Sequence, residues 1–349
     1  MKNKNFLKIS SIYFTAIVLI AVVFIFGHLG LIESDILSAT LIQIVVMFAI
    51  PLLMYTLLVS KNLKQTFADT GFKKISKKMI LITIGLGFVL YFLNQFVATI
   101  FQSIVSLFGY ESISSSPQVV LDDKFLLKEL ILSCILPGIC EEFLHRGIVM
   151  HAGKKTTNPR YVLLISSILF GLVHLNIKQF FYAAILGYLI GMVGIISDSI
   201  YPCMIIHFMN NFLGSFLYYG SKLKWPISSF IMKVTDAMYA NPITLICAML
   251  VGIPLLVYLY RIMVKKLAKE RNNMKMQKIV KELKMSNITI EEAQAKIDMV
   301  NSVLAQSYKL KIENNNLEKP KFSSKIFIIS SIVLGTLITI SSFIWGILW

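Results

Sequence analysis

Charged side chains are scarce in this sequence. Only 15% of its 349 residues are charged, and 56% are hydrophobic, with a mean hydropathy of +0.73. Typical soluble domains carry about 25% charged residues. A chain this apolar lacks the polar groups to cover a soluble surface, which argues against a soluble enzyme and against a disordered protein. We therefore predict an all-α polytopic membrane bundle, with about eight transmembrane helices in the core and one further helix at the C-terminus.

Cysteine is also rare, and its positions form no framework. All four cysteines lie inside apolar stretches without a Cys-x-x-Cys pair, at Cys134, Cys140, Cys203 and Cys247. This pattern argues against a disulfide scaffold. We expect buried free thiols.

Acidic residues are outnumbered, because 18 Asp and Glu stand against 34 Lys and Arg and give a net charge of +16. A nucleic-acid binder can be this basic, but the long apolar runs argue against nucleic acid as a partner.

A spanning helix needs about 20 largely apolar residues. Nine segments approach this, the fifth to seventh being short: Ile9–Leu31, Ile36–Val59, Met79–Phe108, Phe125–Met150, Tyr161–Leu175, Phe180–Ile196, Tyr201–Tyr218, Ile243–Val264 and Lys325–Leu348.

Lys and Arg gather at alternate ends of these spans. They precede the first span and follow the second and the fourth, so the positive-inside rule predicts a cytosolic N-terminus in the cell membrane. Thirty lysines against four arginines suggest an AT-rich bacterial genome. We divide the chain into N-terminal transmembrane helices at 1–120, a core at 121–264, a basic cytosolic insert at 265–323 and a last helix at 324–349.

The insert is the most basic part of the chain, since the segment Arg261–Lys325 carries +8, half of the total charge. Thr289 to Glu292 matches a capping box, which predicts the start of a helix in a short helical hairpin. The insert can attract the anionic inner leaflet, bind a partner protein, or serve as a solvated spacer. These alternatives stay open.

A few polar residues stand where an apolar span is expected. Glu141 and Glu142 interrupt the fourth segment, and each acid costs roughly 2.5–3.5 kcal/mol at the centre of a span. Glu142 and Arg146 are four residues apart and can pair on one helical face, whereas Glu141 points about 100° away. An ion-pair cluster that only holds the helix in register is the structural alternative.

Two later spans carry further polar groups. His174 follows Phe170 by four residues, so the ring and the imidazole share a face. On the seventh segment His207 and Asn211 have the same spacing, with Asn210 as a competitor. The fourth, fifth and seventh spans thus bring an acid, an imidazole, and an imidazole with an amide to comparable depth. Each would be costly against lipid and favourable around a hydrated cavity.

A carboxylate beside an imidazole can activate water, and a second imidazole with an amide can stabilise an oxyanion. Neither a Gly-x-Ser-x-Gly elbow nor a His-Glu-x-x-His motif occurs. Glu141, His174 and His207 could instead hold zinc with an open water position. Zinc is therefore a second option, although the favoured mechanism requires no cofactor.

The three motifs resemble those of the CAAX-protease and bacteriocin-processing (CPBP, Abi) family of intramembrane endopeptidases, which includes the type II CAAX prenyl endopeptidases and is often labelled a metalloprotease family. They are Glu141-Glu142-x-x-x-Arg146, Phe170-x-x-x-His174 and His207-x-x-x-Asn211, with Leu186 to Gly191 before the last. The similarity runs from about Leu130 to Gly214.

The resemblance implies a helical endopeptidase with a cavity open toward the cytosol. It implies that Glu141 is the base that activates water, with His174 assisting, and that His207 and Asn211 form the oxyanion site. Glu142 and Arg146 would orient the helix, Glu142 also belonging to the candidate catalytic set, and Phe170 would be structural support. His145 receives no role.

We therefore expect hydrolysis of membrane-associated peptides, either CAAX-like C-termini or peptide precursors that are matured by cleavage. The main alternative is a non-catalytic scaffold or bacteriocin-immunity protein that binds a partner through the basic insert. A transporter with a Glu/His proton relay is weaker, because the sequence has no evident repeated half.

Overall fold

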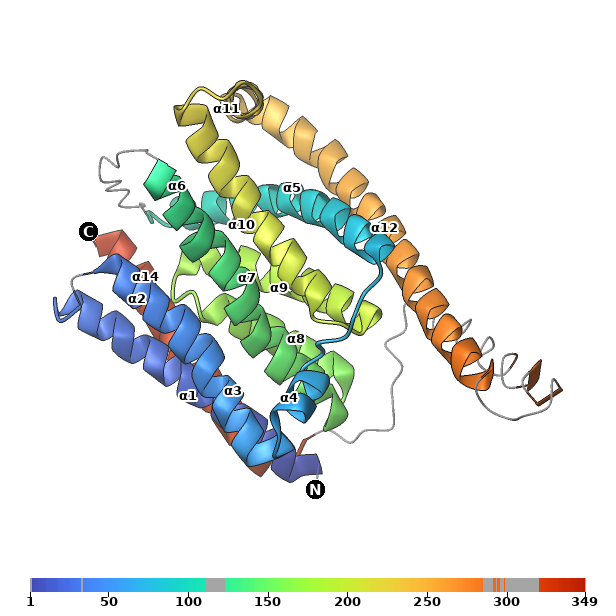
Figure 1. The fold of residues 1–349 in the computed structure, drawn as a ribbon. Helices are drawn as coiled ribbons and strands as arrows, with labels where there is room; N and C mark the ends of the chain where they lie inside the picture. The colour runs from blue at the N-terminus through green and yellow to red at the C-terminus, as the bar shows by residue number, and fades with distance from the viewer. Residues whose placement is uncertain are drawn as a thin grey trace.

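The computed structural model describes residues 2–32, 34–110, 123–284 and 320–348, together with 291, 292, 294, 295 and 298. Throughout these residues the regular structure is helical, and they contain no strand. Figure 1 shows long helices gathered into one bundle, with α12 extending beyond it. The prediction of an all-α polytopic membrane protein is confirmed.

Every predicted span corresponds to helix. In chain order these helices are α1 (Lys2–His28); α2 (Asp35–Thr40), η1 (Leu41–Ala49), α3 (Ile50–Tyr55) and η2 (Thr56–Ser60); α5 (Lys77–Leu107); α6 (Asp123–Glu129), η3 (Leu130–Ile135), α7 (Leu136–Glu142) and η4 (Phe143–Ala152); α8 (Pro159–Leu172); α9 (Ile177–Ser197); α10 (Tyr201–Lys222); α12 (Pro242–Lys284); and α14 (Phe322–Leu348). The elements η1 to η4 are π-helical turns within the second and fourth spans.

Six helices in the described residues are long and apolar enough to cross a membrane. The fourth and seventh predicted spans, which carry the polar motif residues, and the 14-residue α8 are not among them. Such interruptions are tolerated within a bilayer where neighbouring protein satisfies the polar groups.

Three shorter elements were not predicted: α4 (Leu63–Asp69), η5 (Gly153–Lys155) and α11 (Pro226–Tyr239). The eighth span was predicted to end at Val264, but α12 continues to Lys284 and, with 43 residues, is about 65 Å long. The first part of the basic insert is therefore an extension of a spanning helix, because its Lys-rich sequence keeps good helix formers throughout. Thr289, where the predicted capping box begins, lies outside the described residues. Of the predicted hairpin the structure describes residues 291, 292, 294, 295 and 298, which are helical.

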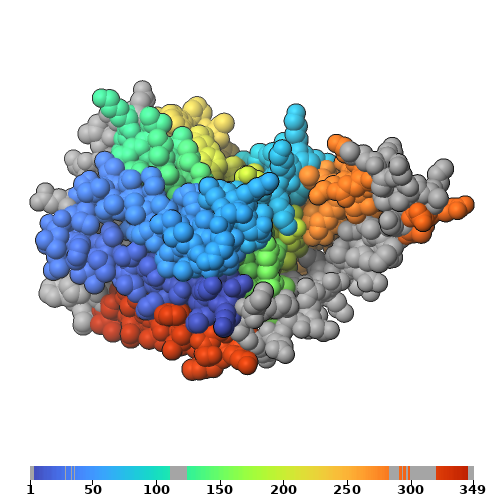
Figure 2. All heavy atoms as spheres, turned by 60° about the horizontal axis from the view of Figure 1, so that its bottom comes forward, coloured from blue at the N-terminus to red at the C-terminus, as the bar shows by residue number. Residues whose placement is uncertain are grey.

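The helices that carry the motifs lie in the middle of the bundle. The helices α8 and α9 form a hairpin that packs against η4, and α10 packs on α5, α7 and η3. Figure 2 shows α14 lying along α1, and both cover the α8 side of the bundle. All ten residues of η4 are buried, so the motif helix is enclosed by protein.

Glycine allows α9 to approach this motif helix closely. A Cβ added at Gly187 would lie 3.1 Å from both the Arg146 Nη2 atom and the Phe170 ring. Small residues at such contacts let membrane helices pack backbone to side chain.

An ion cluster ties the lysine-rich end of the bundle together. Asp198, which ends α9 in a left-handed conformation, contacts Lys73 at 2.6 Å, Lys154 at 3.0 Å and Lys275 of the α12 extension at 4.0 Å. Burial alone would raise the pKa of this carboxyl, but the charges and hydrogen bonds of Lys154 and Lys73 lower it well below its usual range. The cluster joins the α4–α5 loop, η5, the α9–α10 turn and α12.

We predict that Asp198→Asn destabilises the protein at pH 7, because Asn keeps the left-handed backbone but leaves the lysines without their counter-charge. Hydrogen bonds to charged groups contribute about 1.5–3 kcal/mol, so the unfolding temperature in detergent should fall by several degrees. Since the folded pKa is depressed, this stability is fully present above the ordinary Asp pKa of about 4 and is lost as the pH falls below it. The difference between wild type and variant should therefore shrink in acid.

Asp236→Asn on the exposed face of α11 is the matched control and should unfold as the wild type does. Equal stability of Asp198→Asn and wild type at pH 7 would contradict the role of the cluster.

Candidate active site

The Glu142 carboxylate is the centre of a buried clamp between helices. Its Oε1 atom accepts hydrogen bonds from Arg146 Nη1 at 2.7 Å and from His207 Nδ1 at 2.9 Å. The side chains of Glu142 and Arg146 are both 0% exposed. The predicted pairing of Glu142 with Arg146 is thus present, and His207 adds α10 to it.

Arg146 extends the clamp to two further elements. Its Nη2 atom donates to the main-chain oxygen of Gly187 on α9 at 3.1 Å, and its guanidinium carbon lies 4.1 Å from the centroid of the Phe170 ring. A guanidinium presents several donors in a rigid plane and stacks on aromatic faces. One cation therefore holds α7, η4, α8 and α9 in register.

Phe170 is surrounded by the candidate imidazoles. The rings of His145, His174 and His207 meet it edge to face at centroid distances of 5.2, 5.2 and 5.4 Å. Edge-to-face contact of aromatic rings fixes their orientation. The position of Phe170 agrees with the supporting role that the resemblance implies.

Glu141 lies beside the clamp and is only 8% exposed. Its Oε1 atom accepts a hydrogen bond from Gln43 Nε2 at 2.8 Å. Its Oε2 atom is buried, has no hydrogen-bond partner among the described residues, and lies 4.0 Å from His207 Nε2. Each of the two neighbouring acids keeps one buried oxygen without a partner among the described residues. They differ in their other oxygen, because Glu142 is paired with the Arg146 cation and Glu141 with the neutral amide of Gln43.

Gln43 was not identified from the sequence. It lies on η1, 98 residues before its partner Glu141. The one feature of the sequence that could have identified it is an amide side chain inside an apolar span. Polar side chains within membrane helices commonly hydrogen bond across helices.

His174 lies in the α8–α9 turn, just beyond the end of α8 at Leu172, whereas the prediction placed it on a helix. Its contact with Phe170 is nevertheless present. The Nδ1 atom lies 2.8 Å from the Phe170 main-chain oxygen, which can only accept. This bond assigns the proton to Nδ1 and leaves the lone pair of Nε2 for another partner.

The same reasoning applies to His207. Its Nδ1 atom must donate to the ionised Glu142, so Nε2 either carries a lone pair or, in the imidazolium, a second proton. That nitrogen is the one that lies near Glu141.

Asn211 lies one helical turn after His207 and outside the clamp. Its Nδ2 atom donates to the Ser133 main-chain oxygen at 2.9 Å, and its Oδ1 atom accepts from Asn210 at 3.1 Å. Because an amide nitrogen has two protons, one of them is not used by Ser133. Asn210 in turn accepts from Asn94 at 3.5 Å.

Asn211 lines a polar cavity of about 400 Å³ between α5, η3, α9 and α10. We call it the amide cavity, because Asn94, Gln95, Gln102, Asn210 and Asn211 contribute to its wall, together with Tyr91, Ala98, Ser133, Tyr182, Gly214 and Ser215.

The amide cavity lies in the half of the bundle away from the lysine-rich turns. Its α9 residue, Tyr182, is near the start of that helix, whereas Asp198 of the ion cluster follows its end. The resemblance implied a cavity open toward the cytosol, which the positive-inside rule predicts to be the lysine-rich side. Here all ten residues of η4, which leads to a lysine-rich turn, are buried, and the amide cavity lies in the other half of the bundle.

His145 is a buried structural residue. Its Nδ1 atom bonds the main-chain oxygen of Glu141 at 2.8 Å, and its Nε2 atom lies 3.3 Å from the Tyr13 hydroxyl. Its contacts connect α1 to the motif helix, which agrees with the absence of a predicted catalytic role.

The zinc option was tested against this geometry. In the described part of the chain, no group of three His, Cys, Asp or Glu side chains lies at the spacing that a metal requires. The residues as they lie therefore do not fit a three-ligand zinc site built from Glu141, His174 and His207.

Comparisons with known proteins agree with the motifs. Residues 123–213 match the family model described as type II CAAX prenyl endopeptidase Rce1-like. The chain is 28% identical over 201 residues to the Bacillus subtilis (strain 168) protein named "Putative membrane peptidase YdiL", covering 57% of this chain and 81% of that protein. No solved structure matches the chain.

These comparisons confirm the predicted CAAX-protease-like resemblance and support a membrane protease. Gln43 and Tyr13 lie outside the segment that the family model matches.

We predict that Arg146→Gln is strongly destabilising, because it leaves the Glu142 carboxylate buried without its cation. Breaking a buried pair in this way costs about 3–5 kcal/mol, measured as a lower unfolding temperature in detergent. The double variant Glu142→Gln, Arg146→Gln removes both charges and should recover part of the loss.

Lys155→Gln is the control, since its pair with Asp69 is half exposed at the lysine and should contribute less than about 1 kcal/mol. An Arg146→Gln protein that unfolds like this control would show that the clamp does not stabilise the fold.

Proposed function

We propose that this chain is an intramembrane endopeptidase in which Glu141 activates water to hydrolyse a peptide bond of a membrane-associated substrate. The observation that supports the proposal most is the unpartnered Oε2 atom of Glu141, buried 4.0 Å from the His207 imidazole. A buried acceptor without a partner is costly, and a water molecule that donates to it would satisfy it.

In the proposed reaction Glu141 removes a proton from this water as the water oxygen attacks the carbonyl carbon of the scissile bond. The free Nε2 lone pair of His174 orients the second proton of the same water. The proton held by Glu141 then passes to the leaving amine, and the C–N bond breaks to give an amine and a carboxylic acid, which keeps the second proton of the water. General-base catalysis of this kind contributes about 10²–10⁴ in rate.

The tetrahedral oxyanion is stabilised by His207 and Asn211. Since His207 Nδ1 donates to Glu142, it can donate to the oxyanion through Nε2 as an imidazolium, whose charge Glu142 balances. The second amide proton of Asn211 adds another donor. Removing one oxyanion donor typically costs about 10²–10³ in rate.

Gln43 is a positioning residue in this scheme. Its amide holds the Oε1 atom of Glu141 and thereby directs Oε2 toward the reacting water. Glu142 and Arg146 position His207, and Phe170 positions the imidazole rings.

The substrates that fit the proposal are CAAX-like C-termini or peptide precursors at the membrane. The proposed location is the membrane of a bacterial cell with the N-terminus in the cytosol, which the lysine-rich ends of the spans support through the positive-inside rule. The basic insert at 265–323, whose first part belongs to α12, is proposed to contact anionic lipid or a partner protein.

We predict that Glu141→Gln, reconstituted in liposomes with a peptide library, loses cleavage by at least about 100-fold while unfolding at the wild-type temperature. Glu282→Gln on the exposed end of α12 is the matched control and should cleave normally. Equal products from wild type and Glu141→Gln would contradict the catalytic assignment.

The same assay addresses zinc. After dialysis against a strong chelator, the proposed mechanism predicts unchanged cleavage. Loss of cleavage that added zinc restores would instead support the metal mechanism.

A further inference from the structure

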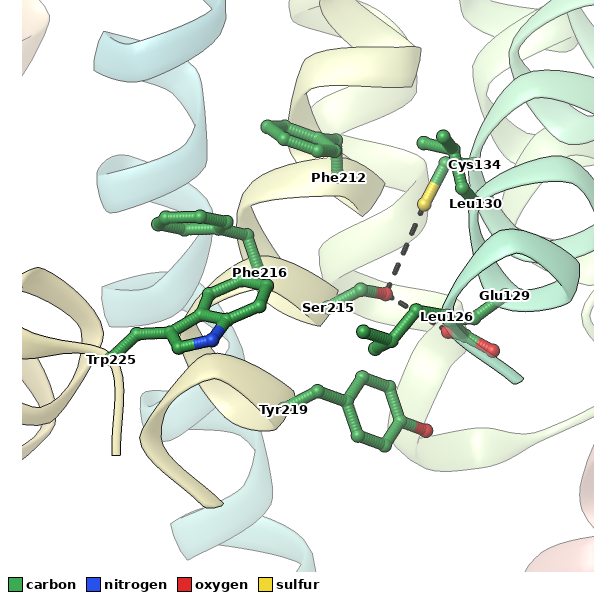
Figure 3. Close-up of a pocket in the computed structure, with 9 residues that line it drawn as sticks. All are labelled: Leu126, Glu129, Leu130, Cys134, Phe212, Ser215, Phe216, Tyr219 and Trp225. Atoms are coloured by element: carbon green, nitrogen blue, oxygen red, sulfur yellow. Dashed lines mark hydrogen bonds between the residues drawn. The ribbon is translucent and has the colours of Figure 1, made fainter. Parts of the chain in front are cut away.

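A second, apolar pocket of about 190 Å³ lies beside the amide cavity. We call it the aromatic pocket. Figure 3 shows Phe212, Phe216 and Tyr219 of α10 and Trp225 on one side of it, and Leu126 and Leu130 on the other. Phe212 and Phe216 stack along α10 with ring centroids 5.7 Å apart, and Trp225, which precedes α11, meets Phe216 at a tilt with centroids 5.4 Å apart.

One wall of the aromatic pocket is polar. Glu129 accepts hydrogen bonds from Ser215 Oγ and from Ser133 Oγ, both at 2.9 Å (Figure 3 shows the bond to Ser215). Ser215 lines both the aromatic pocket and the amide cavity, and Asn211 lies one helical turn before it. The two spaces therefore meet at Ser215, on the way to the candidate oxyanion residue.

Size and polarity assign different occupants to the two spaces. Pockets for whole small-molecule ligands usually measure about 300–1,000 Å³, so the aromatic pocket suits a single bulky side chain and is too small for a long lipid chain. The amide cavity is larger and has no charged group in its wall. Amide side chains both donate and accept, as an extended peptide backbone requires.

We propose that the aromatic pocket binds one bulky apolar side chain of the peptide substrate, whose extended backbone lies in the amide cavity between Ser215 and Asn211. The proposal rests on the proposed function and names its substrate class: an uncharged extended peptide segment with an aromatic or large aliphatic residue. The Glu129 carboxylate disfavours acidic residues at this position. The peptide reaches Glu141 from the half of the bundle opposite the lysine-rich turns.

Binding can be measured without cleavage in the Glu141→Gln protein. The chain has three tryptophans, and replacing Trp345 and Trp349 by Phe leaves Trp225 of the aromatic pocket as the fluorescent reporter. The probes are N-acetylated, C-amidated heptapeptides of serine and glycine with one central Phe, Ala or Asp. We expect the Phe peptide to alter Trp225 fluorescence and to bind at least 10-fold more tightly than the Ala peptide, with the Asp peptide weakest.

A pocket-filling variant makes the test specific. Leu130→Phe adds bulk inside the aromatic pocket without adding a second tryptophan, whereas Ile131→Phe adds the same side chain at the next residue, which is 40% exposed. Leu130→Phe should weaken binding of the Phe peptide at least 10-fold and binding of the Ala peptide less than 2-fold, and Ile131→Phe should change neither. Three results would overturn the proposal. They are equal weakening of the binding of both peptides, no weakening of either, and displacement of the Phe peptide by low concentrations of a free fatty acid.

Cleavage by the protein with Glu141 intact separates this proposal from the proposed function. If the protein binds the Phe peptide selectively but hydrolyses no peptide, the proposed peptidase activity is contradicted and the proposed role of the aromatic pocket stands. If hydrolysis depends on Glu141 but does not distinguish the Phe peptide from the Ala peptide, the peptidase activity is supported and the proposed role of the aromatic pocket is overturned.

Discussion

The structure depends on the neutralisation of one carboxylate, Glu142, in the middle of a membrane bundle. An isolated charge there is expensive, and this one is fully buried. Its oxygen is shared by Arg146 and His207, so the charge is stabilised when α7, η4 and α10 come together. Arg146 also binds the backbone of α9 at Gly187, where the lack of a Cβ leaves room for the guanidinium. The hydrogen bonds that satisfy this single acid and its arginine thus hold four elements together, namely α7, η4, α9 and α10.

The clamp also gives two consecutive acids different tasks. Neighbours on a helix point about 100° apart, so Glu142 faces Arg146 while Glu141 faces Gln43 and the His207 Nε2 atom. The charge of the first carboxylate is compensated by Arg146, whereas the second is bound only by the neutral amide of Gln43. Each keeps one buried oxygen without a partner among the described residues. In the proposed mechanism this difference separates positioning from chemistry. The same helix continues as a π-helical segment that is buried at every residue, so the polar space next to Asn211 lies in the opposite half of the bundle.

Sequence patterns predicted the contacts that are local. Hydropathy located the spans, and four-residue spacing predicted both the Glu142–Arg146 pair and the contact between Phe170 and His174. Gln43 and Tyr13 were missed, because hydrogen bonds across 98 and 132 residues leave no periodic signal. The His174 turn was mistaken for helix, since an apolar stretch does not show where a helix ends inside a bilayer. The aromatic pocket was not predictable either, because it requires the spacing along α10 and the placement of α6, η3 and Trp225 together.

Thermal unfolding of Glu142→Gln beside Glu141→Gln, in the same detergent, tests the central claim most directly. Glutamine keeps the size of each side chain and removes its charge. The account predicts a large loss of stability for Glu142→Gln, because the buried Arg146 cation loses its partner, and little change for Glu141→Gln. A Glu142→Gln protein that unfolds at the wild-type temperature, or a Glu141→Gln protein that loses more, would contradict it.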